Sequence, residues 1–202
     1  MGTITDKLNC LINTKEGIRQ EINRAYNTEE ISNSDTFNSY IQKLEEHPFY
    51  LKGLVDGTIE SIKLSNATSI GDSAFSSCSG LTSVSFPNAT SIGIYAFQNC
   101  SSLTEVSFPN ATSIGDYAFQ NCSSLTEVSI PNAKSIGTYA FDSCSNLTTI
   151  YVGTESDTVC TLSSRDAIPS SVTDIYVPAS LVDSYKSATN WSSFASKIKA
   201  TP

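Results

Sequence analysis

The chain has 202 residues, a formal net charge of −8 at pH 7 and a pI near 4.5. This length allows a substantial core and two or three structural units. Nucleic acids and anionic membrane surfaces bind clustered Lys and Arg, so the acidic balance argues against both as partners. Only 16% of the residues are charged. The surface is therefore expected to be rich in the hydroxyl and amide groups of Ser, Thr and Asn.

The N-terminus lacks the pattern of a secretory signal peptide, which has a basic start, an apolar run and a small-residue cleavage site. We therefore expect a protein made in the cytoplasm, which reaches a virion or a cell surface only if it serves in attachment. No apolar stretch reaches the roughly 20 residues of a membrane-spanning helix, so membrane insertion is not expected.

Residues 1–48 are predicted to form a helical head. Their apolar residues recur mostly at helical spacing, first up to Tyr26 and again from Phe37 to Leu44, and Pro48 ends the second run. The segments T-K-E-x-I-R-Q-x-I and S-D-T-F-x-S-Y-x-x-K-L resemble a short helical module of tail-associated proteins from phages and prophages of Gram-positive bacteria. The alternative is a cap that shields the first repeat of the next region. A head of this kind could also join copies of the chain into a homo-oligomer.

A repeat dominates the middle of the chain, within a predicted domain over residues 49–152. Four copies of a 22-residue unit follow one another, the second reading SIGIYAFQNCSSLTEVSFPNAT. A fixed period of this length indicates a solenoid, and the spacing L-x-x-V-x-I predicts one parallel strand per unit. A half-repeat, Thr58–Thr68, aligns Ile62 with Val84 and starts the sheet one rung early. Each strand should end at a Pro-Asn turn, and Ser-Ile-Gly-x-x-Ala-Phe should form a short helical turn.

Three residue types recur once per unit. The phenylalanines are predicted to form a buried column, and the cysteines a column of reduced, buried thiols, because Cys packs as a small hydrophobe and parallel rungs hold its Cβ atoms too far apart for a disulfide. The glycines indicate a backbone turn. These columns are Phe75, Phe97, Phe119 and Phe141; Cys78, Cys100, Cys122 and Cys144; and Gly71, Gly93, Gly115 and Gly137.

The block L-T-x-V-S-[FI]-P-N-A-x-S-I-G-x-Y-A-F-x-x-C resembles the bacterial leucine-rich repeats of the BspA-like class. This resemblance covers roughly residues 58–152. It implies a right-handed α/β solenoid with its parallel sheet on the concave face, used for attachment or recognition and not for chemistry.

Residues 153–202 are predicted to hold an insertion, a last strand and a C-terminal cap helix. The period slips after Val152, and the strand pattern resumes at Val172, about three residues late. Pro178 ends that strand. A helix starting near Ala179 is predicted to carry one apolar face as far as Ile198.

Nothing in the sequence indicates an enzyme or a cofactor. A nucleophile would need a base nearby, and the single histidine, His47, precedes a proline at the end of a predicted helix. No nucleotide-binding glycine motif occurs. Metal binding is not indicated either, because there is no C-x-x-C pair.

Candidate ligand-binding residues lie on the strands. Alternation along each strand turns the second and fourth residues after the leucine towards solvent. These positions are mostly Ser in the early repeats and become acids and tyrosines later, a change that favours ligand contact, because exposed Tyr provides rigid, amphipathic contact area. Two solvated glutamates remain the simpler interpretation of the Glu105–Glu127 pair. The candidate residues are Glu105, Glu127, Thr149, Tyr151, Asp174 and Tyr176.

The sequence thus predicts a non-enzymatic binding or attachment protein whose partner is a protein or a cell-surface glycan. Within this hypothesis, the expected absence of a signal peptide favours a phage tail or receptor-binding component over a bacterial surface adhesin. A structural spacer without a ligand is the rival, and an enzyme is the least favoured alternative.

Overall fold

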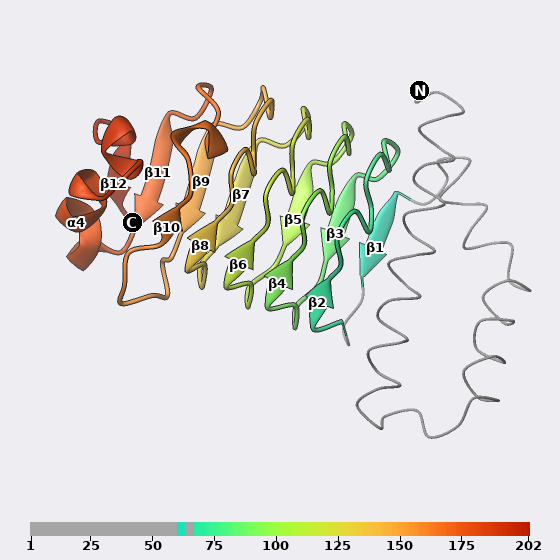
Figure 1. The fold of residues 1–202 in the computed structure, drawn as a ribbon, viewed down its shortest axis with the longest axis horizontal. Coiled ribbons are helices and arrows are strands. Elements are labelled where there is room, and N and C mark those ends of the chain that lie inside the picture. The colour runs from blue at the N-terminus through green and yellow to red at the C-terminus, as the bar shows by residue number, and fades with distance from the viewer. Residues whose placement is uncertain (1–59, 64–66) are drawn as a thin grey trace, which may run out of the picture.

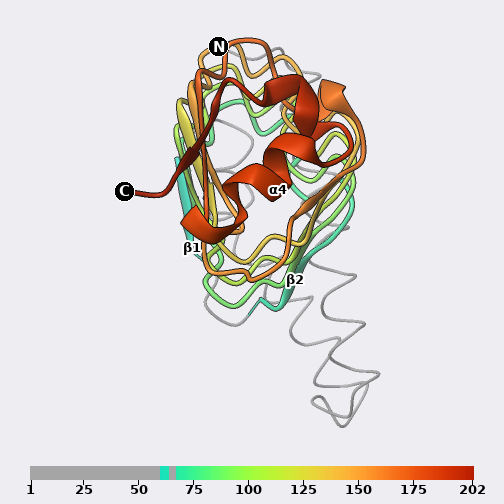
Figure 2. The same ribbon diagram turned by 90° about the vertical axis from the view of Figure 1, so that its left-hand side faces the viewer.

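The structure is a computed structural model that describes residues 60–63 and 67–202 (Figure 1). The predicted helical head, residues 1–48, lies outside the described residues. From Ser61 onwards the chain winds as a solenoid whose rungs follow one another along one axis, as predicted. Each rung has two short strands on different sides of the closed coil, as the view along the axis shows (Figure 2).

The predicted strands form the first side of the solenoid, here called the sheet face. Every paired strand runs parallel to its partner, and Ile62 lies beside Val84, which confirms the half-repeat. Hydrogen-bonded pairing is interrupted between β5 and β7, although these two strands contact each other. The strands are β1 (Ser61–Lys63), β3 (Ser83–Ser85), β5 (Glu105–Ser107), β7 (Glu127–Ile130), β9 (Thr149–Val152), β11 (Asp174–Val177) and β12 (Ile198–Ala200).

A second parallel sheet, which the sequence did not reveal, forms another side. It uses the Ser-Ile pair of each repeat, so that Ile70 lies beside Ile92 and Ile92 beside Ile114. This sheet continues past the point where the first is interrupted. Its strands are β2 (Ser69–Ile70), β4 (Ser91–Ile92), β6 (Ser113–Ile114), β8 (Ser135–Ile136) and β10 (Thr161–Leu162).

The third side, here called the turn face, consists of residues 72–78, 94–100, 116–122 and 138–144. The predicted helical turn is wrong here: two residues of each turn have positive φ, such as Tyr95 at 57° and Asn99 at 60°. Alternate N–H groups therefore point along the solenoid axis and bond to the next rung. In one rung the pairs are Tyr95 to Asp116, Phe97 to Ala118 and Asn99 to Gln120, with N···O distances of 3.0, 2.7 and 2.8 Å.

The predicted core is present between these three sides. The phenylalanine rings stack face to face, with 5.3 Å between the centroids of Phe97 and Phe119. The thiols of Cys100, Cys122 and Cys144 are free and buried, and each donates to a phenylalanine carbonyl, at 3.1 Å for Cys100 and Phe75. Burial raises the pKa of Cys100 to about 12. Cys78 differs from the others because it is disulfide-bonded. The expectation of reduced thiols is therefore confirmed for three positions and wrong for Cys78.

The recurring glycines allow neighbouring rungs to approach closely. A Cβ atom on Gly115 would lie 2.6 Å from the carbonyl carbon of Gly93, and one on Gly137 would lie 2.5 Å from the backbone nitrogen of Asp116. Real Cβ atoms do not come so near to backbone, so only glycine fits. The requirement is thus close backbone approach between rungs.

The predicted insertion, residues 153–171, continues the coil with altered spacing. Thr161 pairs with Ser135, four residues beyond the 22-residue period, and Asp174 pairs with Thr149, three residues beyond it. The late return of the strand is therefore confirmed. Between these two strands lies a short 3₁₀ helix, η1 (Arg165–Ala167).

The C-terminal segment does not form the single cap helix that was predicted. It contains η2 (Ala179–Leu181), α4 (Val182–Ser187) and η3 (Trp191–Phe194), and then β12, which adds a strand beside β11. Ile198 lies in this strand and not in a helix. α4 crosses the C-terminal end of the solenoid (Figure 2). Among residues 60–63 and 67–202, no helix has the length and apolar character needed to span a membrane.

Side chains of the C-terminal segment hold the chain at Cys160. The Cys160 N–H donates to the hydroxyl of Tyr185 at 2.9 Å, and its carbonyl accepts from Trp191 Nε1 at 2.6 Å. Tyr185 and Trp191 are buried and pack edge to face, with 5.3 Å between their centroids. Both backbone polar groups of this buried residue are thereby satisfied.

Candidate ligand-binding face

The candidate site lies at the C-terminal end of the sheet face, on β7, β9, β11 and β12. Strand register places Thr149 between Glu127 and Asp174, and Tyr151 beside Tyr176. These five side chains were predicted to be neighbours, and the strand pairing brings them together. Their strands alternate between buried and accessible residues, because one face packs on the core.

Tyr151 and Tyr176 form a stacked pair on this face. Their ring centroids are 4.9 Å apart, and the ring planes differ by 17°. Both residues are half-buried, so each ring keeps an accessible part. A stacked pair on neighbouring strands offers a stiff amphipathic surface with two hydroxyl groups.

An ion pair lies next to the tyrosines. The Lys199 ammonium group bonds to Asp174 Oδ1, and Thr173 Oγ1 donates to Asp174 Oδ2 at 2.9 Å. The bond to Lys199 lowers the pKa of Asp174, and the same bond raises the pKa of Lys199. Both groups therefore stay charged over the physiological range. The pair fixes a positive and a negative group at the edge of the aromatic surface.

Two carboxylates lie near Tyr151. Partial burial raises the pKa of the Tyr151 hydroxyl, and the nearby Glu127, Tyr176 and Asp174 raise it further. The hydroxyl therefore remains protonated and able to donate a hydrogen bond. The pattern suits a ligand with hydrogen-bond acceptors above the ring pair.

Glu105 is less closely connected to this cluster. It is exposed on β5 beside Ser83, and the hydrogen-bonded ladder is interrupted between β5 and β7. The structure thus supports the grouping of Glu127 with the tyrosines more strongly than a Glu105–Glu127 pair. In the described part of the chain, no three His, Cys, Asp or Glu side chains form a cluster suited to a metal ion.

Lys199 is the member of the cluster that the sequence did not reveal. It lies beside Tyr176 because β12 pairs with β11. The segment Ile198–Ala200 has three residues, too few for alternation to distinguish a strand from the end of a helix. The composition of this segment did not indicate a strand either.

Comparison with known families identifies the repeat. The model of the BspA type leucine rich repeat region matches residues 12–90 and 56–163, which together are more than half of the chain. The chain therefore belongs to the BspA-type leucine-rich repeat family. The match begins at residue 12, inside the segment predicted to be a separate head. Nothing in the comparisons supports the likeness of that segment to phage tail proteins.

Several solved structures share the fold. A leucine-rich repeat protein from Bacteroides ovatus is 26% identical with a TM-score of 0.56, over 71% of this chain and 36% of that one. The T. pallidum leucine-rich repeat protein TpLRR is 24% identical with a TM-score of 0.54, over 59% of each chain. The pneumococcal vaccine antigen PcpA is 20% identical with a TM-score of 0.53, over 71% of this chain and 42% of its own. The chain thus spans between about one third and three fifths of these proteins. A search of curated proteins finds no match.

Proposed function

We propose that this protein is a non-enzymatic attachment module that binds a protein or glycan ligand at the C-terminal end of its sheet face. The stacked Tyr151–Tyr176 pair beside the Asp174–Lys199 ion pair is the observation that carries this proposal. Tyrosine is among the residue types that most often dominate binding energy at interfaces.

Family membership supports the same class of function. BspA-like proteins are often surface adhesins or binding proteins. The surface adhesin therefore becomes the favoured form of the proposal, and the phage tail component, which the sequence favoured, stays a prediction. A spacer without a ligand would have no need for the change from serine in the early rungs to tyrosine in β9 and β11.

The direct test is binding of the full chain to whole cells and to a glycan array. Tyr151→Ala, Tyr176→Ala and Glu127→Ala should each weaken binding, with the tyrosine changes about tenfold or more, as expected for aromatic contact residues. Ser107→Ala is the matched control, because Ser107 is exposed on β5 of the same face but lies away from the tyrosines. It should leave binding unchanged.

Two outcomes would contradict the proposal. Full binding by all three variants would place the ligand elsewhere on the chain. No binding of the wild type to any cell type or glycan would favour the spacer.

A further inference from the structure

A second aromatic feature lies on the turn face, away from the candidate site. Tyr95, Tyr117 and Tyr139 occupy the same position in successive rungs and stack in a column, with centroid spacings of 5.0 and 5.2 Å. Tyr95 and its neighbour Ile94 are the large apolar side chains that are most exposed in the described part of the chain, at 37% and 41%. None of the three rings belongs to the buried core.

The backbone at this position does not favour tyrosine. The three tyrosines have φ between 55° and 57°, the left-handed region that Gly, Asn and Asp adopt most easily. The first rung has Ser73 at the same place, with φ of 56°. A small polar residue is therefore sufficient for the turn. Residues in strained backbone conformations cluster at functional sites.

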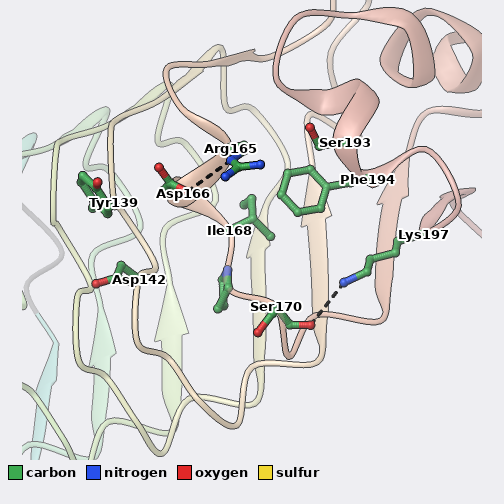
Figure 3. A pocket seen from close by; sticks show the side chains of 10 residues that line it. Tyr139, Asp142, Arg165, Asp166, Ile168, Ser170, Ser193, Phe194 and Lys197 are labelled. Atoms are coloured by element: carbon green, nitrogen blue, oxygen red, sulfur yellow. Dashed lines mark hydrogen bonds and ion pairs between the residues drawn. The ribbon is translucent and has the colours of Figure 1, made fainter.

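The column ends at a groove beyond Tyr139 (Figure 3). One face of the Tyr139 ring packs on Tyr117, and among residues 60–63 and 67–202 no ring stacks on its other face. The groove has a volume of about 530 Å³. The buried side chains of Ile168 and Phe194 line it, with Asp142 on the side of Tyr139.

The hydrogen-bond ladder of the turn face opens at the same place. In preceding rungs the equivalent N–H donates to the next rung, as Tyr117 does to Thr138 at 2.9 Å, but the Tyr139 N–H has no acceptor among the described residues. The carbonyl at the corresponding place belongs to Arg165, and it accepts from Ile168 inside the turn after η1. The Tyr139 N–H therefore lacks the acceptor in the next rung that its counterparts have, and Tyr139 lines the groove.

A column of side-chain amides ends here too. Gln98 donates to Gln120 at 2.7 Å, and Gln120 donates to Asp142 Oδ2 at 2.9 Å. Asp142 Oδ1 has no partner in the part of the chain that the structure describes. The groove thus brings together a tyrosine ring that stacks on another ring on one face alone, a backbone donor and a carboxylate acceptor.

The charges around the groove balance. Arg165 and Asp166 form an ion pair at 3.6 Å, and Lys197 faces the ring of Phe194 while its ammonium group donates to the Ser170 carbonyl at 3.2 Å. With Asp142, two cations and two anions border the space, so a neutral ligand is favoured over an ion. Because a hydroxyl group both donates and accepts, a polyhydroxylated ligand could satisfy both Asp142 and the Tyr139 N–H. An aromatic side chain of a peptide would cover the ring face but would itself offer no such set of donors and acceptors, so the peptide backbone would have to supply them.

We propose that this groove binds a neutral sugar unit, with its ring on the free face of Tyr139 and its hydroxyl groups on Asp142 and the Tyr139 N–H. This site is separate from the sheet face, so the two proposals can be tested independently of each other. Its size is within the range of small-molecule sites, about 300–1,000 Å³.

Saturation-transfer NMR on the full chain tests the proposal, with the methyl glycosides of glucose, galactose, mannose and N-acetylglucosamine as probes. At least one glycoside should receive saturation. Tyr139→Asn should weaken its binding about tenfold. Asn adopts positive φ readily, so this variant should keep its fold, which a denaturation midpoint would verify. Asp142→Asn should also weaken binding, since an amide can still accept from Gln120 but is a poorer acceptor for sugar hydroxyls.

Tyr95→Asn is the matched control: the residue type, repeat position and φ are the same, but Tyr95 lies at the other end of the column. Its sugar binding should equal that of the wild type. Absence of saturation transfer to all four glycosides would overturn the proposal, as would equal losses in Tyr95→Asn and Tyr139→Asn. Loss in Tyr176→Ala with full binding by Tyr139→Asn would assign the sugar to the sheet face instead. Binding of N-acetyltyrosinamide without binding of any glycoside would replace the sugar with an aromatic peptide.

Discussion

The regular rungs and the C-terminal segment bury their backbone by different means. In the rungs, the same backbone bonds to the neighbouring rung recur at the same repeat positions, and the rings of the Phe97 column stack on one another. In the segment after Val152, single side chains such as Tyr185 and Trp191 bond to the backbone of Cys160. One region relies on repetition, and the other relies on bonds that occur once.

This difference determines how a substitution in each region should affect stability. A contact in the rungs is repeated by its neighbours, so its loss should be read mainly as lost packing. A bond in the C-terminal segment has no equivalent elsewhere, so its loss leaves a particular buried group unsatisfied. Four measurements sharpen the contrast.

The largest effect is expected in the ring column. Phe119→Ala should lower the free energy of unfolding by about 3–5 kcal/mol, because the ring is fully buried between Phe97 and Phe141 and its removal leaves a cavity. Urea denaturation measures the change. Ser107→Ala on the exposed side of β5 is the control and should be nearly silent, and equal midpoints for the two variants would show that the core assignment is wrong.

Alkaline pH should destabilise both regions. Burial raises the pKa of Cys100 in the rungs and of Cys160 in the C-terminal segment from 9.0 to about 12. The folded state therefore holds these protons more tightly than the unfolded chain. The stability that this provides is complete below a pH of about 9 and is lost as the pH rises towards 12.

Urea midpoints measured at increasing pH check this. The midpoint should fall above a pH of about 9. Cys160→Ala should show a shallower decline than the wild type, because one shifted thiol is gone. A constant midpoint up to a pH of about 11 would contradict the expected burial of these thiols.

Tyr185→Phe tests the bonds that occur once. The change leaves the buried Cys160 N–H without its acceptor and should cost about 1–3 kcal/mol, while the ring and its packing on Trp191 remain. Tyr117→Phe is the matched control. Its hydroxyl has no partner among the described residues, so stability should be unchanged. A silent Tyr185→Phe would mean that Cys160 does not depend on this hydroxyl.

The smallest effect is expected at Lys199. Lys199→Ala should leave the urea midpoint within error, because exposed ion pairs contribute little to stability. The pKa of Asp174 should nevertheless rise, since the bond to Lys199 is the main cause of its lowered value. NMR titration of the Asp174 carboxylate measures this, and an unchanged pKa would contradict the pairing.

The sequence was sufficient where a pattern repeats. Alternation around Val84 and Val128 revealed the strands, and the recurrence of Phe119 and its equivalents revealed the core. The Ser-Ile strands have only two residues, which is too short for alternation to appear. The turn at Tyr95 opposes the conformational preference of tyrosine, so propensity could not predict it.

The candidate sites show the same limit. The Tyr151–Tyr176 pair followed from register, because both residues belong to recognisable strands. Lys199 joined them through a three-residue strand without a clear pattern. The groove beside Tyr139 forms where the chain around η1 leaves the hydrogen-bond pattern of the turn face. One of its proposed binding groups is a backbone N–H, which every residue except proline has. Sequence patterns carry no information on such atoms.

The near identity of successive rungs also bears on folding. Ser91–Ile92 pairs with Ser113–Ile114, but the same two residue types recur at Ser135–Ile136. A pairing shifted by one whole rung would therefore make almost the same strand contacts as the native pairing. Weakly specified strand register invites slippage and misassembly. The bonds from Tyr185 and Trp191 to Cys160 can form in one arrangement alone. We therefore expect these bonds to fix the position of the last rung and, through it, the strand register of the rungs before it.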